Sequence, residues 1–544
     1  MTEVADFVVV GAGSAGCAVA GRLSEDEGTS VALLDAGGSG RSWVVTMPGA
    51  LVFMVAGGLN NWRFNTVPQK GLQGRIGFQP RGRGLGGSSA INAMIYTRGH
   101  RADYDHWAAL GNNGWSYADV LPYFRRAENN ADFADDYHGS SGPLHVGGLR
   151  TESPMHAIFL EAARQGKFPI REDFNGAEQE GLGIYQVTQH EGERWSAARA
   201  YVLPHLGKRT NLRVETRSRV TRLLFEGRRA VGVEFRQGHR LRQLRARREV
   251  IVAAGAIQSP QILMLSGIGD AASLRRHGIA VIHDLPGVGR NLQDHPDFIF
   301  NYRSEAPYFF GFALRRLAGQ VRAVGRYWRE RRGMMTTNFA ECGGFLKTRP
   351  ELEIPDVQLH FGMAIVHDHG RKQLMDHGFS CHACLLRPIS RGSVQLRNAD
   401  PFAAPLIDPN FLGEDADLDS MVAAYKLTRR LMETPVLSRL QTKDLVTAEV
   451  STDDDIRAIL RQRVDTVYHP VGTCRMGVND PLAVVDPQLK VHGFEGLRVV
   501  DASIMPTLIG GNTNAPAIMI GEKAADMIRK EHGLTSIHLS PASV

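Results

Sequence analysis

Residues 7–16 read "FVVVGAGSAG" and predict the fold of the N-terminal part of the chain. The apolar, β-branched run at 7–10 is typical of a buried parallel strand. Three glycines follow it at the spacing G-x-G-x-x-G. Residues 17–23 then predict a helix, and residues 30–37 ("SVALLDAG") predict a second strand that ends in an acid. Strand, glycine turn, helix, strand and acid, in this order, predict a Rossmann-type unit that binds the ADP part of a dinucleotide. A sterically required turn without a ligand is the weaker alternative.

The residues of this unit have expected roles. Gly11 makes the tight turn, and Gly13 lets the backbone approach a pyrophosphate on the helix N-terminus. Asp35, which follows Gly11 by 24 residues, is expected to take the ribose hydroxyls. The other cofactor contacts predicted here are Ser14, Gly16 and Ala36. The fingerprint alone does not distinguish FAD from NAD.

Length, charge and cysteine content exclude several classes of protein. The chain has 544 residues, enough for two to four domain-sized units, and a net charge of +6, which is modest for this length. It shows no zinc-finger spacing, basic tail or RNA-type aromatic motif, so nucleic-acid binding is not expected. No apolar run approaches the length of about 18 residues that a membrane span needs. Five cysteines argue against a disulfide scaffold, and no export signal is visible. We therefore expect a cytoplasmic protein.

Residues 80–99 ("PRGRGLGGSSAINAMIYTRG") form a second glycine cluster. Five glycines with adjacent serines imply backbone that lies close against a flat or anionic group. Apolar residues such as Ile91 and Tyr96 make a solvated flexible loop the weaker alternative. Four later segments are as distinctive: "GAIQSPQILMLSGIG" (255–269), "HPVGTCRMG" (469–477), "LRVVDASIMPT" (497–507) and "GGNTNAPAIMIGEKAADMI" (510–528).

Together these segments resemble the glucose–methanol–choline (GMC) family of FAD-dependent oxidoreductases. The resemblance runs in order from residue 7 to about residue 528, and is strongest toward members that are choline dehydrogenase-like or that oxidise aliphatic alcohols. It implies an α/β protein with a Rossmann-type FAD-binding domain and a second α+β substrate domain built on an antiparallel sheet. It also implies oxidation of a primary alcohol to the aldehyde, with electrons passed to a quinone-type acceptor. An oxidase that reduces O2 to H2O2 stays open, as does, more remotely, a hydroxynitrile lyase.

The FAD-binding domain is expected to be discontinuous, because the fingerprint and the matching "VVDAS" segment lie at opposite ends of the chain. We predict this domain at 1–155, 206–297 and 463–535. The substrate domain is then predicted at 156–205 and 298–462. The runs "PDVQLHFGMAIV" and "GSVQLRNADP" are expected to belong to its antiparallel sheet, which would form the roof over the flavin.

His469, the first residue of "HPVGTCRMG", matches the histidine that faces the flavin in the family. Oxidising an alcohol removes a hydroxyl proton and a hydride from the same carbon. The resemblance implies hydride transfer to flavin N5, with His469 as the base. Asn512 would hold the alcohol oxygen by hydrogen bonding, because an amide is not a base. The chain has 20 histidines, and without the resemblance a structural role would be the better interpretation. Asn514 is expected to bond the local backbone.

Further cofactor contacts are implied by the resemblance, with Asn92 and Ala93 at the flavin edge and Val220 holding the adenine by its backbone. The remaining residues of this set are Trp62, Gly86, Asp501 and Ala502. Relatives with covalently attached flavin carry a histidine at or near the position before this asparagine. Ile91 stands there in this chain and cannot bond to the flavin, which implies non-covalent FAD.

Three weaker signals remain. No metal site is expected, since the C-x-x-C pair Cys381 and Cys384 lies in a strand-like run without a second ligand pair. The loop with His367 and His369 is expected near the entrance of the active site. Segment 314–332 combines seven arginines with one apolar helix stripe, made of Leu314, Leu317, Val321, Val324 and Trp328. It is either a helix packed on the substrate domain or a peripheral contact with an anionic membrane surface.

Overall fold

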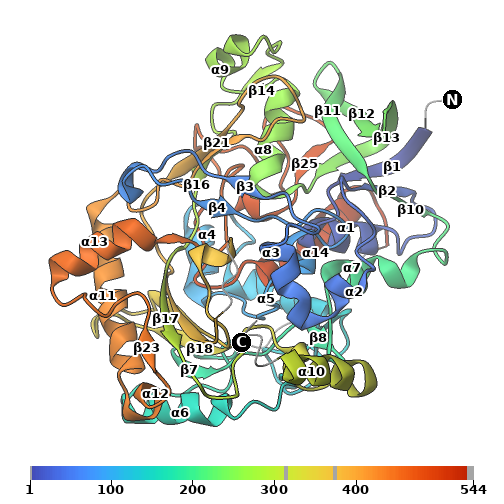
Figure 1. Cartoon of the computed structure of the whole chain (residues 1–544). Helices are drawn as coiled ribbons and strands as arrows, with labels where there is room; N and C mark the ends of the chain where they lie inside the picture. Colours follow the sequence, from blue (N-terminus) through green and yellow to red (C-terminus); the bar gives the residue numbers. More distant parts are fainter. Residues whose placement is uncertain (1–2, 312–316, 372–375, 536–544) are drawn as a thin grey trace.

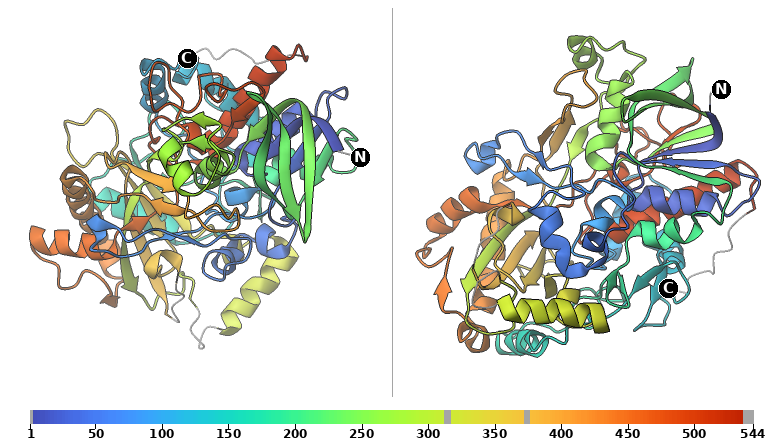
Figure 2. Two further views of the ribbon diagram at one scale, coloured as in Figure 1. Left: turned by 90° about the horizontal axis from the view of Figure 1, so that it is seen from above. Right: turned by 45° about the vertical axis from the view of Figure 1, so that its right-hand side comes forward.

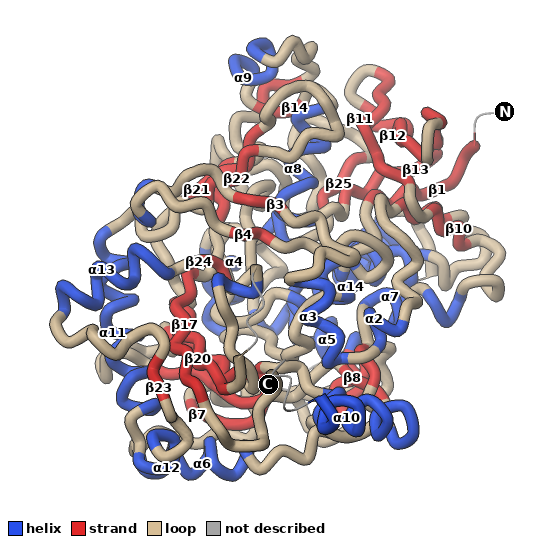
Figure 3. The backbone as a smooth tube through the Cα atoms, in the orientation of Figure 1, coloured by secondary structure: helices blue, strands red, loops and turns tan. Residues whose placement is uncertain are grey.

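The computed structural model describes residues 3–311, 317–371 and 376–535. Within these residues the strands gather in two main groups, one around the N-terminal strand and one built mostly from the middle of the chain (Figures 1 and 3). This confirms the predicted α/β class with a second part built on an antiparallel sheet. The domain boundaries drawn from the sequence stay predictions.

The first group is a seven-stranded sheet that carries the glycine fingerprint. Strands β1, β2, β10 and β25 run parallel to their neighbours, whereas β11, β12 and the first part of β13 form an antiparallel meander. Residues 7–10 are at most 3% exposed, which explains their unbroken apolar run. The strands are β1 (Glu3–Val10), β2 (Val31–Leu34), β10 (Leu212–Glu215), β11 (Ser218–Glu226), β12 (Arg229–Gln237), β13 (Arg240–Val252) and β25 (Leu497–Val499).

Two long-separated helices cover this sheet side by side. Helix α1 (Ser14–Leu23) follows the glycine turn, and α14 (Asn514–Glu531) lies against it near the C-terminal end (Figure 2). The buried Glu522 of α14 accepts a hydrogen bond from Arg22 Nε of α1 (2.9 Å), and a second from Arg126 Nε (2.6 Å). These bonds hold both ends of the chain in the same layer.

The second group is a six-stranded antiparallel sheet. Because side chains alternate along a strand, Leu359 and Phe361 of β19 face an apolar core with α6 (Met155–Gln165) and α11 (Asp415–Met432). Gln358 and His360 of the same strand therefore face the other way. The strands are β17 (Pro296–Arg303), β18 (Ala340–Leu346), β19 (Val357–Gly362), β20 (Gly378–Leu385), β23 (Lys443–Asp444) and β24 (Asp465–Thr466).

One predicted strand belongs to a different sheet. The run "GSVQLRNADP" forms β21 (Gly392–Gln395), which pairs with β16 (Arg290–Leu292) and β22 (Leu406–Asp408), away from the six-stranded sheet. The run "PDVQLHFGMAIV" does join the six-stranded sheet, as β19. Alternating apolar residues predict a strand but not its partner, which explains the difference.

Where the structure describes its side chains, the apolar stripe of segment 314–332 does not face the protein. In α10 (Leu317–Glu330), Val321 is 64% exposed and Trp328 is 51% exposed, whereas Tyr327 is fully buried. Tyr327 and Ala323 pack against Met47 and Phe310 instead. Two stripes lie next to each other on this helix, and the one that carries Tyr327 makes the contact. Leu314 lies outside the described residues.

No helix among the residues that the structure describes is long and apolar enough to cross a membrane.

Candidate active site

A cavity of about 440 Å³ runs from the glycine turn of the first sheet to the inner face of the second. Most residues predicted as site residues line it, although they come from both ends of the chain. They are Gly11, Gly13, Ser14, Asp35, Ala36, Trp62, Asn92, Ala93, Val220, His469, Asp501, Ala502 and Asn512.

Gly16 and Gly86 were predicted to contact the cofactor, but they do not line the cavity. A Cβ atom added to Gly16 would lie 1.9 Å from the carbonyl oxygen of Gly11, so this residue lets α1 start directly behind the turn. Gly86 has a φ of 95° and donates its N–H to the carbonyl of Ala12 (2.8 Å). Both glycines therefore shape the turn from behind.

The turn itself exposes the N-terminus of α1 to the cavity. Gly11 has a φ of 101°, and a Cβ atom there would lie 2.5 Å from the carbonyl oxygen of Ala253. A Cβ atom on Gly13, by contrast, would meet only Ala253, at 3.9 Å, because this residue faces open space. Free N–H groups and the positive end of the helix dipole at this position favour an anion.

Asp35 lies at the carboxyl end of β2, beside the turn. Its carboxylate accepts hydrogen bonds from the backbone N–H of Ala12 (3.0 Å) and of Gly37 (2.7 Å). These bonds fix the carboxylate in the cavity wall, where it can accept from hydroxyl groups. The cavity continues past Val220 to Trp62, which stacks on Phe64 with ring centroids 5.7 Å apart.

Asp501 supports the middle of the cavity. Its carboxylate accepts from the N–H of Gly255 (2.8 Å), from Ser259 Oγ (2.5 Å) and from the N–H of Ser503 (2.8 Å). It therefore bonds hydroxyl and amide groups, as its negative charge requires. Asn514 was expected to bond local backbone, and this was wrong. Its Oδ1 accepts from Ser14 Oγ (2.7 Å), because the N-termini of α1 and α14 meet here.

His469 lies in the loop after β24 and is 8% exposed. Its backbone N–H donates to Asp294 Oδ1 (2.8 Å), and its Nε2 lies 3.1 Å from Asn512 Nδ2. Asp294 also accepts from Thr466 Oγ1 (2.6 Å), so one buried carboxylate holds two points of the loop. The histidine is thus fixed both through its backbone and through its ring.

Hydrogen bonds determine which nitrogen of His469 carries the proton. His295 Nε2 lies 3.1 Å from the carbonyl oxygen of Ile509, which can only accept, so His295 is protonated at Nε2. Burial lowers the pKa of His295 to about 3, so its Nδ1 is an acceptor. The two Nδ1 atoms of His295 and His469 are 3.0 Å apart, and the proton between them belongs to His469. Nε2 of His469 is therefore the unprotonated ('bare') nitrogen, and it faces Asn512.

The surroundings keep this imidazole neutral. Burial lowers the pKa of His469 well below its usual value, and the nearby His295, His360 and Arg81 lower it further. A neutral imidazole with a bare Nε2 in a cavity wall is able to accept a proton from a bound hydroxyl.

Asn512 is oriented by two donors on other elements. Its Oδ1 accepts from Gln358 Nε2 of β19 (3.0 Å) and from Thr97 Oγ1 (3.2 Å). The amide N–H₂ group is consequently turned toward His469. The donor and the proton acceptor lie 3.1 Å apart and face each other in the cavity wall, so an alcohol oxygen bound beside both can accept from the amide and donate to the imidazole.

Sequence reasoning missed the residues that support this pair, namely Asp294, His295, Gln358 and Thr97. They come from three segments, because Asp294 and His295 are neighbours, and none stands in a spaced motif around His469. The only signal was the polar stretch 291–297 ("NLQDHPD") before a strongly apolar strand. His367 lines the cavity, and the place of its loop near the entrance stays a prediction.

The weak cysteine signal has a structural explanation. Cys381 and Cys384 are buried and free, and they lie three positions apart in β20, in two different apolar clusters. Among residues 3–311, 317–371 and 376–535, no group of three or more metal-ligating side chains is present.

The cavity fits FAD. It offers a helix N-terminus for a pyrophosphate and a carboxylate for ribose hydroxyls, and it extends from there to His469. Fold and site together define a flavin-dependent oxidoreductase.

Comparisons with known proteins agree with this class. Two family models described as GMC oxidoreductase match residues 5–297 and 388–521. The chain is 44% identical to an alcohol dehydrogenase (acceptor) of Pseudomonas putida, covering 98% of this chain and 97% of that protein. It is 45% identical to the mitochondrial choline dehydrogenase of Homo sapiens, covering 97% and 90%. Among solved structures, a formate oxidase of Aspergillus oryzae RIB40 matches with a TM-score of 0.92 at 28% identity, over 98% of this chain and 99% of that one.

The chain belongs to the GMC oxidoreductase family. The resemblance recognised in the sequence is thereby confirmed, together with FAD as cofactor and with the class of oxidoreductases that act on CH–OH groups.

Proposed function

We propose that this protein oxidises an uncharged primary alcohol to the aldehyde and passes the electrons to a quinone. The observation that supports it most is the bare Nε2 of His469 beside the amide donor of Asn512, 3.1 Å away. Bound FAD supplies the hydride acceptor. His469 takes the hydroxyl proton at Nε2, and Asn512 Nδ2 holds the oxygen as negative charge develops on it.

The remaining site residues have proposed roles in holding FAD. Gly11, Gly13 and Ser14 would hold the pyrophosphate, Asp35 and Ala36 the ribose, and Val220 and Trp62 the adenine end. Asp501 and Ala502 would lie along the ribityl chain, and Asn92 and Ala93 at the flavin edge. The cofactor is proposed to be non-covalent because the residue before Asn92 is Ile91, whose side chain forms no bond to a flavin.

An uncharged substrate is proposed because the carboxylates near the reacting end are occupied. Asp376 of the cavity wall receives three hydrogen bonds from Arg303. The buried Asp297 accepts from His382 (2.6 Å) and does not line the cavity. A quaternary ammonium group would need a free carboxylate or an aromatic cage. Val467, Ile365 and Met94 in the wall suit an aliphatic or aromatic group instead.

The test is an anaerobic screen in which alcohols bleach the flavin absorbance. Choline and its neutral isostere 3,3-dimethyl-1-butanol form a matched pair of equal shape. We expect the isostere to bleach the flavin faster than choline does. Faster bleaching by choline would contradict the proposed substrate class, and a flavin that no alcohol bleaches would contradict alcohol oxidation altogether, leaving the lyase alternative.

The acceptor is tested in the same cuvette. After bleaching, air or a soluble ubiquinone analogue is added, and the return of the flavin absorbance is followed. We expect return within seconds with the quinone and slow return in air. Rapid return in air with formation of H2O2 would establish the oxidase alternative instead.

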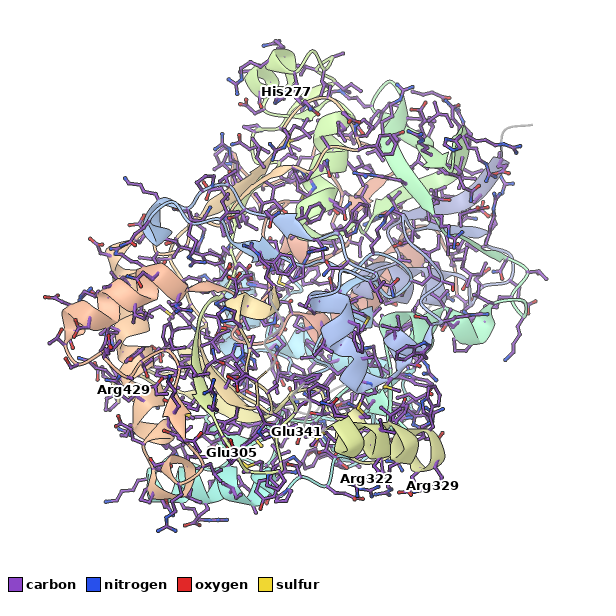
Figure 4. All side chains as sticks on the ribbon, viewed as in Figure 1. His277, Glu305, Arg322, Arg329, Glu341 and Arg429 are labelled. Carbon is purple, nitrogen blue, oxygen red and sulfur yellow. The ribbon has the colours of Figure 1, made fainter. Side chains whose placement is uncertain are left out.

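The surface around α10 supports a peripheral membrane contact, which quinone reduction requires. In addition to Val321 and Trp328, the nearby α2 (Trp43–Thr46) and α3 (Leu51–Val55) expose Trp43 (52%) and Phe53 (41%). Arg322 and Arg329 of α10 lie at the rim of the molecule (Figure 4). Aromatic side chains next to arginines match the interface of an anionic bilayer. Other residues of α3 line the cavity.

Membrane binding is tested with vesicles of phosphatidylglycerol and phosphatidylcholine. Flotation of the wild type should be salt-sensitive, and Val321→Ser combined with Trp328→Ser should weaken it at least fivefold. Leu241→Ser is the matched control, because Leu241 is 63% exposed on the first sheet. Equal flotation of all three proteins would contradict this contact.

A further inference from the structure

Arg194 is a buried cation without an acidic partner. Three arginine side chains belong to the largest fully buried groups of the described residues: Arg98, Arg194 and Arg498. Arg98 pairs with Glu128, and Arg498 pairs with Glu249 (2.7 Å). No carboxylate of the described residues pairs with Arg194, and its Nη2 atom is buried without a hydrogen-bond partner.

Four neutral oxygens surround the rest of this guanidinium. Nε donates to the carbonyl of Val45 (3.0 Å), and Nη1 donates to the carbonyl of Ser89 (3.3 Å). Nη1 also contacts both the carbonyl oxygen (2.6 Å) and the side-chain Oδ1 (2.8 Å) of Asn92. Arg194 therefore stands directly behind a residue that lines the cavity.

Such an arrangement is costly in the protein alone. A buried charge without a counter-charge is strongly destabilising, and carbonyl dipoles offset only part of this. Burial lowers the pKa of Arg194 to about 9, so the group still carries its charge at neutral pH. The missing negative charge is then expected on the other side of Asn92, in the cavity.

We propose that Arg194 is the fixed positive charge that favours electron uptake by FAD bound against Asn92 and Ala93. The proposal rests on the proposed function, because it takes the flavin ring to lie at these residues. When an alcohol is oxidised, its hydroxyl proton goes to His469 and its hydride, two electrons and one proton, goes to the cofactor. The transfer leaves one additional negative charge next to Asn92. Arg194 acts as a positioning residue, since its contact with the cavity runs through Asn92.

The experiment measures sulfite binding and the midpoint potential of the bound flavin in three variants. Sulfite adds to flavin and places negative charge on the ring without any alcohol or electron acceptor. Arg194→Gln removes the positive charge and keeps a hydrogen-bond donor. Arg194→Lys keeps the positive charge and loses the planar arrangement of N–H donors of the guanidinium. Arg199→Met is the matched control: this arginine lies five residues away but is already paired with Glu193 (2.5 Å).

We expect the dissociation constant of sulfite to rise at least tenfold in Arg194→Gln, with a lower midpoint potential. Arg194→Lys and Arg199→Met should stay within threefold of the wild type. Wild-type sulfite affinity in Arg194→Gln would overturn the proposal, as would a tenfold loss in Arg194→Lys, because geometry rather than charge would then matter. If Arg194→Gln retains no FAD, the sulfite affinity of Arg194→Lys decides, and a tenfold loss there overturns the proposal. A failure of alcohols to bleach the flavin would leave these sulfite results unchanged, so the two proposals fail separately.

Discussion

Around Gly11 the cavity wall is made of backbone, whereas around His469 it is made of side chains. The turn after β1 depends on the absence of Cβ atoms at a few glycines, which stand close together in the sequence. The pair His469 and Asn512 depends on side chains from several elements, including β19 and the segment before β17. A backbone site tolerates almost no added atom, while a side-chain site loses its contacts one hydrogen bond at a time. The effects of substitutions in the two regions should therefore differ, in their size and in the property that changes.

The largest effect on FAD content is expected for Gly16→Ala. The new Cβ atom would lie 1.9 Å from the carbonyl oxygen of Gly11, so α1 cannot start where the turn requires it. We expect the purified variant to carry less than about a tenth of the wild-type FAD, measured as the ratio of flavin to protein absorbance. Gly38→Ala is the matched control, since no atom lies within 4 Å of its added Cβ atom. Similar FAD content in both variants would remove the contrast between the two regions.

A smaller effect is expected for His295→Leu, which removes the acceptor for the Nδ1 proton of His469. Loss of one orienting hydrogen bond corresponds to roughly a tenfold lower rate of flavin bleaching. The FAD content should not change, and the pH dependence should shift, because either nitrogen of His469 can then carry the proton. An unchanged pH profile at full rate would show that His295 does not set the tautomer.

Gln358→Leu should be milder still. It frees the Oδ1 atom of Asn512 from one of its two donors, and Thr97 still holds the other side. We expect about a threefold to fivefold lower rate of bleaching at a given alcohol concentration. Gln358→Glu, which cannot donate from an ionised side chain, should behave alike. A loss above a hundredfold would place Gln358 in direct contact with the substrate.

The smallest effect concerns pH. The base form of His469 is the neutral one, and its pKa is lowered well below the usual value of about 6.5. The proton-accepting form therefore dominates above that lowered pKa, and it is lost only as the pH falls through it. The ratio kcat/KM should stay flat between pH 8 and about pH 6.5. A half-maximal value at or above pH 6.5 would contradict the neutralising effect of the buried surroundings.

Sequence patterns predicted the turn around Gly11 well and the surroundings of His469 only in part. Gly11, Gly13 and Asp35 follow one another in a short stretch whose geometry is local, so their positions at the cavity could be predicted. His469 was found only through the resemblance to a family, since an isolated histidine carries no local signal. His295, Gln358 and Arg194 could not be found, because their contacts arise only when distant strands pair. The sequence left the orientation of α10 open for a similar reason: two adjacent stripes are apolar, and tertiary packing selected the one with Tyr327.

We propose that His469 removes the alcohol proton, and stopped-flow spectroscopy tests this role most directly. Wild type and His469→Gln, both loaded with FAD, are mixed anaerobically with an alcohol that bleaches the wild type. We predict that bleaching slows by roughly 10²–10⁴-fold in the variant while its FAD content and sulfite affinity stay near the wild-type values. Bleaching within threefold of the wild type would contradict the role of His469.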